Sequence, residues 1–167
     1  MRGILMGMLV AVTMGAQAQE AVKSVVIATD APYSNPDVID SAIVKECGLP
    51  NKVSEMMRAA FADAGIEAKA VTDLKPDSGD AVLMVEIPAA VSSGNAFIGH
   101  SKSVTISGKL FRSGKQVSAF VATRKSSGGV GFKGSCAVLH RCATTLGKDV
   151  AGWLASPVDG AKLGDAR

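Results

Sequence analysis

The chain has 167 residues, of which 47% are hydrophobic and 20% are charged, and its formal net charge is +3. This composition is typical of one compact globular domain and excludes an intrinsically disordered chain. Aromatic residues make up only 4% of the sequence, which argues against a nucleic-acid-binding protein that stacks bases on aromatic side chains.

The first residues have the pattern of an export signal. Arg2 supplies the positive end, residues 4–12 form the apolar middle, and Ala16-Gln17-Ala18 is an A-x-A cleavage site. The apolar run is shorter than the ~18 to 20 residues that a membrane-spanning helix needs. We therefore expect cleavage after Ala18 and a periplasmic mature protein without a transmembrane segment. Gln19 stands where a bacterial lipoprotein carries its lipidated Cys.

The first half of the mature chain predicts a strand and then a helix. Residues 22–28 form a β-branched run that is typical of a buried strand. A connection rich in turn formers follows over residues 30–48. Pro50 then opens a helix that ends at Gly65. Its apolar positions recur at helical spacing and indicate a core stripe, Val53, Met56, Met57, Ala60, Phe61 and Ala64.

Two further strands are predicted before the middle of the chain. Residues 66–71 alternate like a short strand, and residues 81–87 form a second apolar run that Pro88 closes. Residues 89–100 show no clear period. They form either a flexible loop or a bulged continuation of the preceding strand.

A long hairpin with Ser113-Gly114 as its turn comes next. The turn sets a register with one apolar face, in which the pairs are Leu110 with Val117, Gly108 with Ala119, Ile106 with Val121 and Val104 with Thr123. The opposite face is mostly polar and includes Ser107 with Phe120, so it should meet solvent.

The closing helix is predicted over residues 133–153, where apolar residues share one arc. Gly134 and Ser135 mark its start, and Ser156-Pro157 marks its end. The glycines before it lack the G-x-x-x-x-G-K-[ST] spacing of a phosphate loop.

Together these elements predict an α+β fold in a two-layer sandwich. We expect a mostly antiparallel sheet of four or five strands with two helices on one face, because two apolar helix stripes match one apolar sheet face. The domain should span residues 19–157, after a signal peptide at 1–18 and before a flexible C-terminal tail at 158–167.

Three cysteines remain after the signal, so an exported chain allows one disulfide and one free thiol. In a regular helix Cys136 and Cys142 rise ~9 Å apart, beyond the disulfide reach of about 7 Å. We predict one bridge that involves Cys47, with Cys136 as the favoured partner if both helices start at the same end of the sheet. An extra strand at residues 66–71 would separate the two, and three buried free cysteines remain an alternative.

Motifs for catalysis or metal binding are absent from the sequence. Cys136 and His140 lie four residues apart on one side of the predicted helix and could supply two metal ligands. Cys142 points about 120° away from Cys136 around the helix axis, so the pair makes only half of a tetrahedral site. Neither His100 nor His140 accompanies a nucleophile signature. We expect no metal, no cofactor, no catalytic residue and no enzyme.

Charge is distributed unevenly along the chain. Residues 19–86 contain 12 acids and 6 bases, whereas residues 87–148 contain 9 bases and no acid. The basic residues either protect a sheet edge and solvate its outer face or attract an anionic component. The candidates for binding an anion or a partner are Lys109, Arg112, Lys115, Arg124, Lys125 and Lys133.

The export signal, the helix exit at Gly65-Ile66, the strand at 81–87, the hairpin and the closing helix together resemble the small periplasmic α/β domains of bacterial envelope-assembly proteins. Examples are the lipopolysaccharide-assembly lipoprotein and the N-terminal domain of the Tol-Pal propeller protein. The segments 46–50 and 132–136 resemble exported bacterial proteins of unknown function. The absent lipidation Cys departs from the lipoprotein pattern.

These observations predict a non-enzymatic periplasmic cell-envelope accessory or binding module. It would use a basic hairpin face to bind an anionic envelope component or an acidic protein, and not nucleic acid. One alternative is an interaction protein that assembles by strand addition along the hairpin edge, residues 101–108. Another is an enzyme of unrecognised type.

Overall fold

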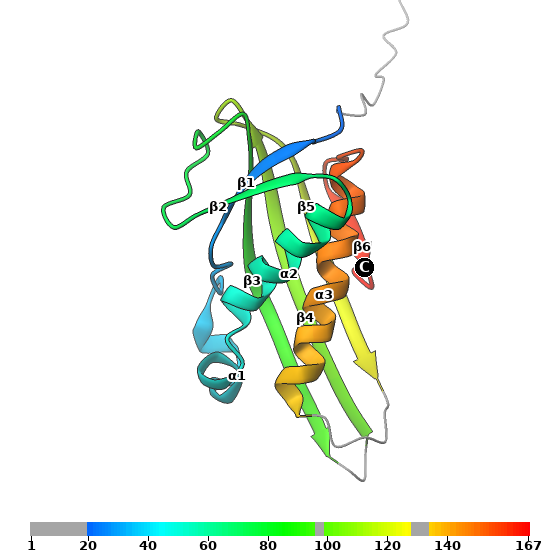
Figure 1. Cartoon of the computed structure of the whole chain (residues 1–167). Coiled ribbons are helices and arrows are strands. Elements are labelled where there is room, and N and C mark those ends of the chain that lie inside the picture. The colour runs from blue at the N-terminus through cyan, green and yellow to red at the C-terminus, as the bar shows by residue number, and fades with distance from the viewer. Residues whose placement is uncertain (1–19, 96–98, 128–133) are drawn as a thin grey trace, which may run out of the picture.

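A computed structural model of the chain describes residues 20–95, 99–127 and 134–167 (Figure 1). The described residues form six strands, three α-helices and one short 3-10 helix. In chain order these are β1 (Ser24–Ala28), η1 (Pro36–Val38), α1 (Ser41–Glu46), α2 (Leu49–Asp63), β2 (Glu67–Val71), β3 (Ala81–Asn95), β4 (Gly99–Arg112), β5 (Lys115–Ser127), α3 (Ser135–Leu154) and β6 (Ala161–Gly164).

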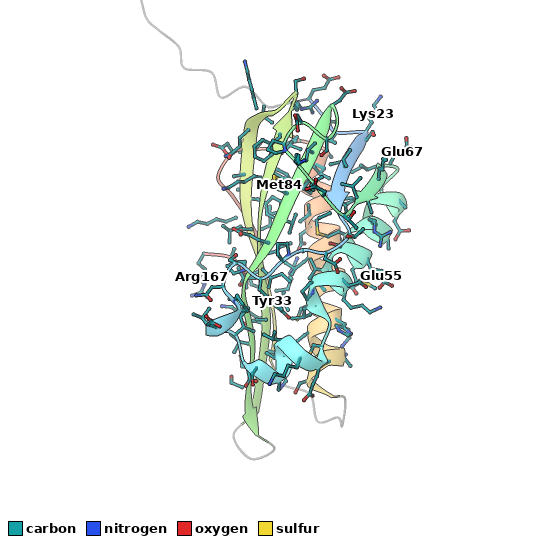
Figure 2. All side chains as sticks on the ribbon, turned by 90° about the vertical axis from the view of Figure 1, so that its left-hand side faces the viewer. Lys23, Tyr33, Glu55, Glu67, Met84 and Arg167 are labelled. Atoms are coloured by element: carbon teal, nitrogen blue, oxygen red, sulfur yellow. A yellow bond between two sulfur atoms is a disulfide. The ribbon has the colours of Figure 1, made fainter. Side chains whose placement is uncertain are left out.

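The described strands form one mixed sheet in the order β2-β1-β3-β4-β5-β6. β1 is parallel to β2 and β3, β4 is antiparallel to β3 and β5, and β6 is parallel to β5. Seen from two directions, α2 and α3 lie on the same side of this sheet (Figures 1 and 2). The α+β class and the two helices on one face agree with the prediction. The sheet has more strands and more parallel pairs than expected.

The parallel pairs arise from the way helices connect strands. α2 carries the chain from one end of β1 back to the other, so β2 starts where β1 starts and runs parallel to it. Residues 72–80 then return the chain to that end again, and β3 is also parallel to β1. Because β4 and β5 reverse direction twice, α2 and α3 both begin at the same end of the sheet.

The hairpin register predicted from the turn is wrong by one residue. Ser113 and Gly114 have φ values of 48° and 76°, which suits a two-residue turn. A β-bulge then shifts the pairing, so that Leu110 lies opposite Ser118 instead of Val117. One inserted residue moves every later side chain to the other face of the strand.

The bulge decides which side chains of β5 enter the core. Phe120, expected at the solvent face, is only 2% exposed, whereas Val121, expected in the core, is 43% exposed. The Phe120 ring meets the Trp153 ring edge-on, with centroids 4.8 Å apart. Gly108 lies opposite Phe120, where a larger residue would collide with the ring. Core packing therefore selects the shifted register.

β3 continues past Pro88, which was expected to close it. The register with β4 shifts between Glu86 and Ala89, so Pro88 sits in a bulge, where its missing N–H is tolerated. Beside this bulge, the Ile87 N–H donates to the Pro32 carbonyl and the Ile87 carbonyl accepts from Ser34 N–H. Of the two alternatives for residues 89–100, the bulged continuation is present up to Asn95.

The C-terminal segment, expected to be a flexible tail, contains β6. Ala161–Gly164 pairs with residues 120–123 of β5, and the Asp165 N–H donates to the Thr123 carbonyl at 2.8 Å. The Asp165 carboxylate accepts a hydrogen bond from Lys125 N–H at 2.9 Å. These partners lie about 40 residues away in the chain, so the short polar sequence of the tail did not reveal them.

α2 and α3 pack closely because α3 carries a glycine at their contact. A Cβ added at Gly147 would lie 2.7 Å from the Met56 carbonyl oxygen and 3.2 Å from the Ala60 side chain. Around this point the fully buried side chains of both helices form the core, including Val53 and Phe61 from α2 and Leu146 and Val150 from α3.

This close contact predicts a position-specific effect of adding one methyl group to α3. Gly147→Ala should lower the free energy of unfolding by about 1 to 3 kcal/mol, because the helices must separate. Gly152→Ala is the matched control, since nothing lies within 4 Å of its added Cβ. The control should be neutral or stabilising by up to about 1 kcal/mol through helix propensity. Urea unfolding followed by circular dichroism measures both, and equal effects would contradict the proposed contact.

Candidate functional site

A disulfide between Cys47 and Cys136 joins the end of α1 to the first turn of α3, with the Cα atoms 5.0 Å apart. The favoured pairing is therefore confirmed. The strand at 67–71 does not separate the two cysteines, because β2 is parallel to β1 and leaves both long helices starting at one end of the sheet. His140 Nε2 lies 2.7 Å from the Cys47 carbonyl, and since a carbonyl only accepts, Nε2 carries the hydrogen.

The third cysteine, Cys142, is a free thiol that is 5% exposed on the core side of α3. Burial raises the pKa of the Cys142 thiol, so the reactive thiolate form is disfavoured. Within residues 20–95, 99–127 and 134–167, no three His, Cys, Asp or Glu side chains are grouped to hold a metal ion.

Arg124, a candidate for anion binding, faces α3 and makes a bidentate ion pair. Its Nε and Nη2 donate to the Asp149 carboxylate at 2.7 and 2.6 Å, and its Nη1 lies 4.0 Å from Asp165. The hydrogen bonds to Asp149 raise the pKa of Arg124. This side chain ties β5 to α3 and to the segment after β6, so its charge is already used inside the protein.

The other basic candidates are dispersed. Arg112 and Lys115 are register partners beside the hairpin turn, and Arg112 Nη2 donates to the Glu20 carbonyl at 2.6 Å. Lys109 and Lys125 are exposed and point to the sheet face opposite the helices. Lys133 lies outside the described residues.

A third lysine joins Lys109 and Lys125 on the face of β4, β5 and β6 that points away from α2 and α3, which we call the outer face. Lys162 of β6 is the register partner of Val121 and is exposed beside it. The sequence analysis does not include Lys162 among the candidate binding residues, because it predicts residues 158–167 to be a flexible tail. The one local indication of a strand there is that polar Lys162 stands between two apolar residues, Ala161 and Leu163, which are half-buried in the structure.

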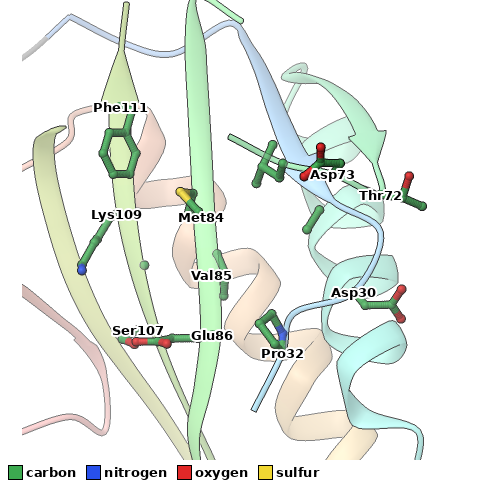
Figure 3. Close-up of a pocket in the computed structure, with 13 residues that line it drawn as sticks. Asp30, Pro32, Thr72, Asp73, Met84, Val85, Glu86, Ser107, Lys109 and Phe111 are labelled. Atoms are coloured by element: carbon green, nitrogen blue, oxygen red, sulfur yellow. The ribbon is translucent and has the colours of Figure 1, made fainter. Parts of the chain in front are cut away.

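A pocket of about 510 Å³ lies at the β3 side of the outer face (Figure 3). Met84 and Phe111 contribute apolar surface, while the segments after β1 and β2 bring Pro32 and Asp73 to the other side. Of the six basic residues predicted to bind an anion or a partner, Lys109 is the one whose side chain lines this pocket among the described residues. Ser107 Oγ donates to Glu86 at 3.2 Å in its wall. The lining combines apolar surface with oppositely charged groups, which is typical of a ligand-binding pocket.

Two solved bacterial protein structures show the same fold. Protein XCC0632 from Xanthomonas campestris, of the DUF330 family model, has a TM-score of 0.58 at 14% identity, covering 87% of this chain and 90% of that chain. A minor lipoprotein from Acinetobacter baumannii has a TM-score of 0.51 at 11% identity, covering 81% and 97%. No family model and no curated protein matches the sequence.

These similarities establish the fold, and the resemblance to the lipopolysaccharide-assembly lipoprotein and the Tol-Pal domain stays a prediction. Among the helices of the described residues, none is both long enough and apolar enough to span a membrane.

The disulfide should contribute strongly to stability. Replacing Cys47 and Cys136 together by Ala should lower the free energy of unfolding by about 2 to 5 kcal/mol, because the bridge closes a long loop in the unfolded chain. Cys142→Ala is the control and should cost about 1 kcal/mol for its small cavity. Guanidinium unfolding measures both. Non-reducing peptide mapping should show one free thiol, and three free thiols would contradict the bridge.

The ion pair of Arg124 also has a testable consequence. Arg124→Met should lower the free energy of unfolding by about 1.5 to 3 kcal/mol, because Asp149, whose side chain is 16% exposed, loses its charged partner. Lys125→Met, at the next residue on the exposed face, should stay within about 0.5 kcal/mol of wild type. Equal losses in urea unfolding of the two variants would show that Arg124 has no special structural role.

Proposed function

We propose that the chain is a non-enzymatic accessory or binding protein of the bacterial cell envelope and that it binds an anionic partner through the outer face. The observation that carries this proposal is the set of exposed lysines there, Lys109, Lys125 and Lys162, one on each of three adjacent strands. The export signal at the start of the chain supports an envelope location. The fold shared with a bacterial minor lipoprotein agrees with that setting.

The alternation of the strands explains why these lysines share a face. Leu110 and Ile106 are fully buried toward the helices, so Lys109, one residue away from Leu110, must point to the other side. On β5 the bulge places Val121 and Lys125 on that same outer side. Glu86 adjoins the face through its hydrogen bond with Ser107, and Asp165 adjoins it through its hydrogen bond with the Lys125 N–H, so acidic groups partly balance the lysines.

The outer face also has the form of a surface for contact. Val121 is 43% exposed beside Lys162, and the Thr105 and Thr123 hydroxyls lie 3.0 Å apart across β4 and β5. Each lysine near an anionic membrane surface contributes about 1 kcal/mol, so three acting together give weak, salt-sensitive binding. An anionic lipid surface is therefore the partner that we propose.

The sheet order argues against the alternative, strand addition along residues 101–108. β4 lies inside the sheet, with β3 on one side and β5 on the other. The outer edge of the hairpin is also closed, because β6 pairs with β5 and two carboxylates accept the flanking amides. Ala119 N–H donates to Asp159 at 2.8 Å, and Lys125 N–H donates to Asp165 at 2.9 Å.

Charge reversal tests the outer face. Lys109→Glu, Lys125→Glu and Lys162→Glu together should abolish co-sedimentation of the mature protein with phosphatidylglycerol vesicles at low salt. Folding should change little, because surface substitutions are usually within about 0.5 kcal/mol each.

The control variant carries Lys45→Glu, Arg141→Glu and Lys148→Glu, which changes the net charge equally but at exposed positions on α1 and α3. It should still sediment with the vesicles. Loss of binding in both variants would indicate net charge alone, and a wild-type protein that never sediments would overturn the proposal.

A further inference from the structure

Lys102 is a buried lysine on the helix side of β4, opposite in direction to the outer face. It is only 8% exposed. Its Nζ donates to Ser92 Oγ on β3 at 2.5 Å and to Ser135 Oγ at the start of α3 at 3.0 Å. The ammonium is therefore held where two strands of the sheet meet the first residue of a long helix.

The charge of this lysine is uncompensated. No carboxylate lies within ion-pair distance of Lys102 in the described part of the chain, and the sequence has no Asp or Glu from residue 87 to residue 148. An ammonium has three hydrogens, and the described residues supply acceptors for two of them, both neutral hydroxyls. A buried cation normally has an anionic partner, because removing its hydration is costly.

The start of α3 adds a second positive potential at the same place. Ser135 begins a helix of 20 residues, and its N-cap, Gly134, provides no side-chain hydrogen bond. The first backbone bond at this end within the described chain runs from Val138 N–H to the Gly134 carbonyl, at 3.4 Å. The N–H groups of Ser135, Cys136 and Ala137 therefore have no acceptor among the described residues. Free N–H groups and the helix dipole both favour an anion here.

The disulfide makes this arrangement rigid. Cys136, next to Ser135, is bonded to Cys47, and His140 one turn later is hydrogen-bonded to the Cys47 carbonyl. The helix start is thus tied to the end of α1, and its first residue, Ser135, accepts a hydrogen bond from Lys102. Pre-organisation of this kind lowers the entropic cost of binding.

We propose that Lys102, Ser92, Ser135 and the first amides of α3 form a binding site for a phosphate-type oxyanion. An ammonium, two hydroxyls and backbone N–H groups supply the donors that such an anion requires. The bound oxyanion neutralises the buried ammonium and accepts from the free helix amides. Free phosphate and a phosphate monoester headgroup of a lipid share this chemistry.

The first test compares thermal unfolding with and without inorganic phosphate. The Tm of the mature wild-type protein should be about 3 °C or more higher in 10 mM phosphate than in sodium chloride of the same ionic strength. Lys102→Met should lose this shift. Lys148→Met, which removes an exposed lysine farther along α3, is the matched control and should keep it. An equal phosphate shift in Lys102→Met and wild type, or none in wild type, overturns the site.

A second measurement needs no variant, so it remains decisive if Lys102→Met does not fold. Titration of the wild-type protein with phosphate, followed by amide NMR, should move the resonances of Ser135, Cys136 and Ala137 with saturation. Sulfate should do the same, whereas chloride should not. Amides that stay unmoved at saturating phosphate overturn the proposal.

Vesicles distinguish the source of the oxyanion. If free phosphate gives the expected shift, phosphatidic acid vesicles that also bind wild type but not Lys102→Met identify a lipid headgroup as a ligand. A phosphate shift without vesicle binding identifies the free ion. The Lys109, Lys125 and Lys162 triple variant should retain the phosphate shift, so failure of the outer-face proposal is separable from failure of this one.

Discussion

The parallel direction of β1 and β3 is the constraint on which the rest of the fold depends. It follows from the β1-α2-β2 crossover and from the return of residues 72–80 to the same end of the sheet. Because of it, α2 and α3 start together and pack side by side at Gly147, and Cys47 comes within bonding distance of Cys136. The disulfide in turn ties the end of α1 to the start of α3, where Ser135 accepts a hydrogen bond from Lys102. A single choice of strand direction thus determines the helix pair, the cross-link and the position of the buried cation.

The basic half of the chain has several different roles in the folded protein. Arg124 is used internally to join β5, α3 and the segment after β6 through Asp149 and Asp165. Lys102 is buried on the helix side of the sheet, whereas Lys109 and Lys125 point to the opposite side. Successive side chains of a strand point to opposite faces, so the basic residues of this half of the chain are separated in the fold. They become a buried cation, a structural ion pair and an exposed face, each in a different electrostatic environment.

Local patterns accounted for the elements with strong periodicity. The stripe of α2, the arc of α3 and the Ser113-Gly114 turn all appear where their residues indicate, because capping, helix periodicity and turn geometry act within a few residues. The residues of the two proposed binding sites could be predicted less well from local patterns. Lys162 was missed because β6 is stabilised by β5, and Lys102 received no role because neither Ser92 nor Ser135 is near it in sequence.

By itself the sequence determined the α+β class, the position of the two long helices, the turn of the hairpin and the asymmetry of charge, since these depend on composition and short-range geometry. Only the tertiary structure decided the register of β4 and β5, where the fit of Phe120 between Gly108 and Trp153 favours a bulge that no local pattern contains. It also decided the strand directions that unite Cys47 with Cys136 and the docking of β6. Those features depend on contacts between distant segments, whose free energy appears only when the whole core is assembled.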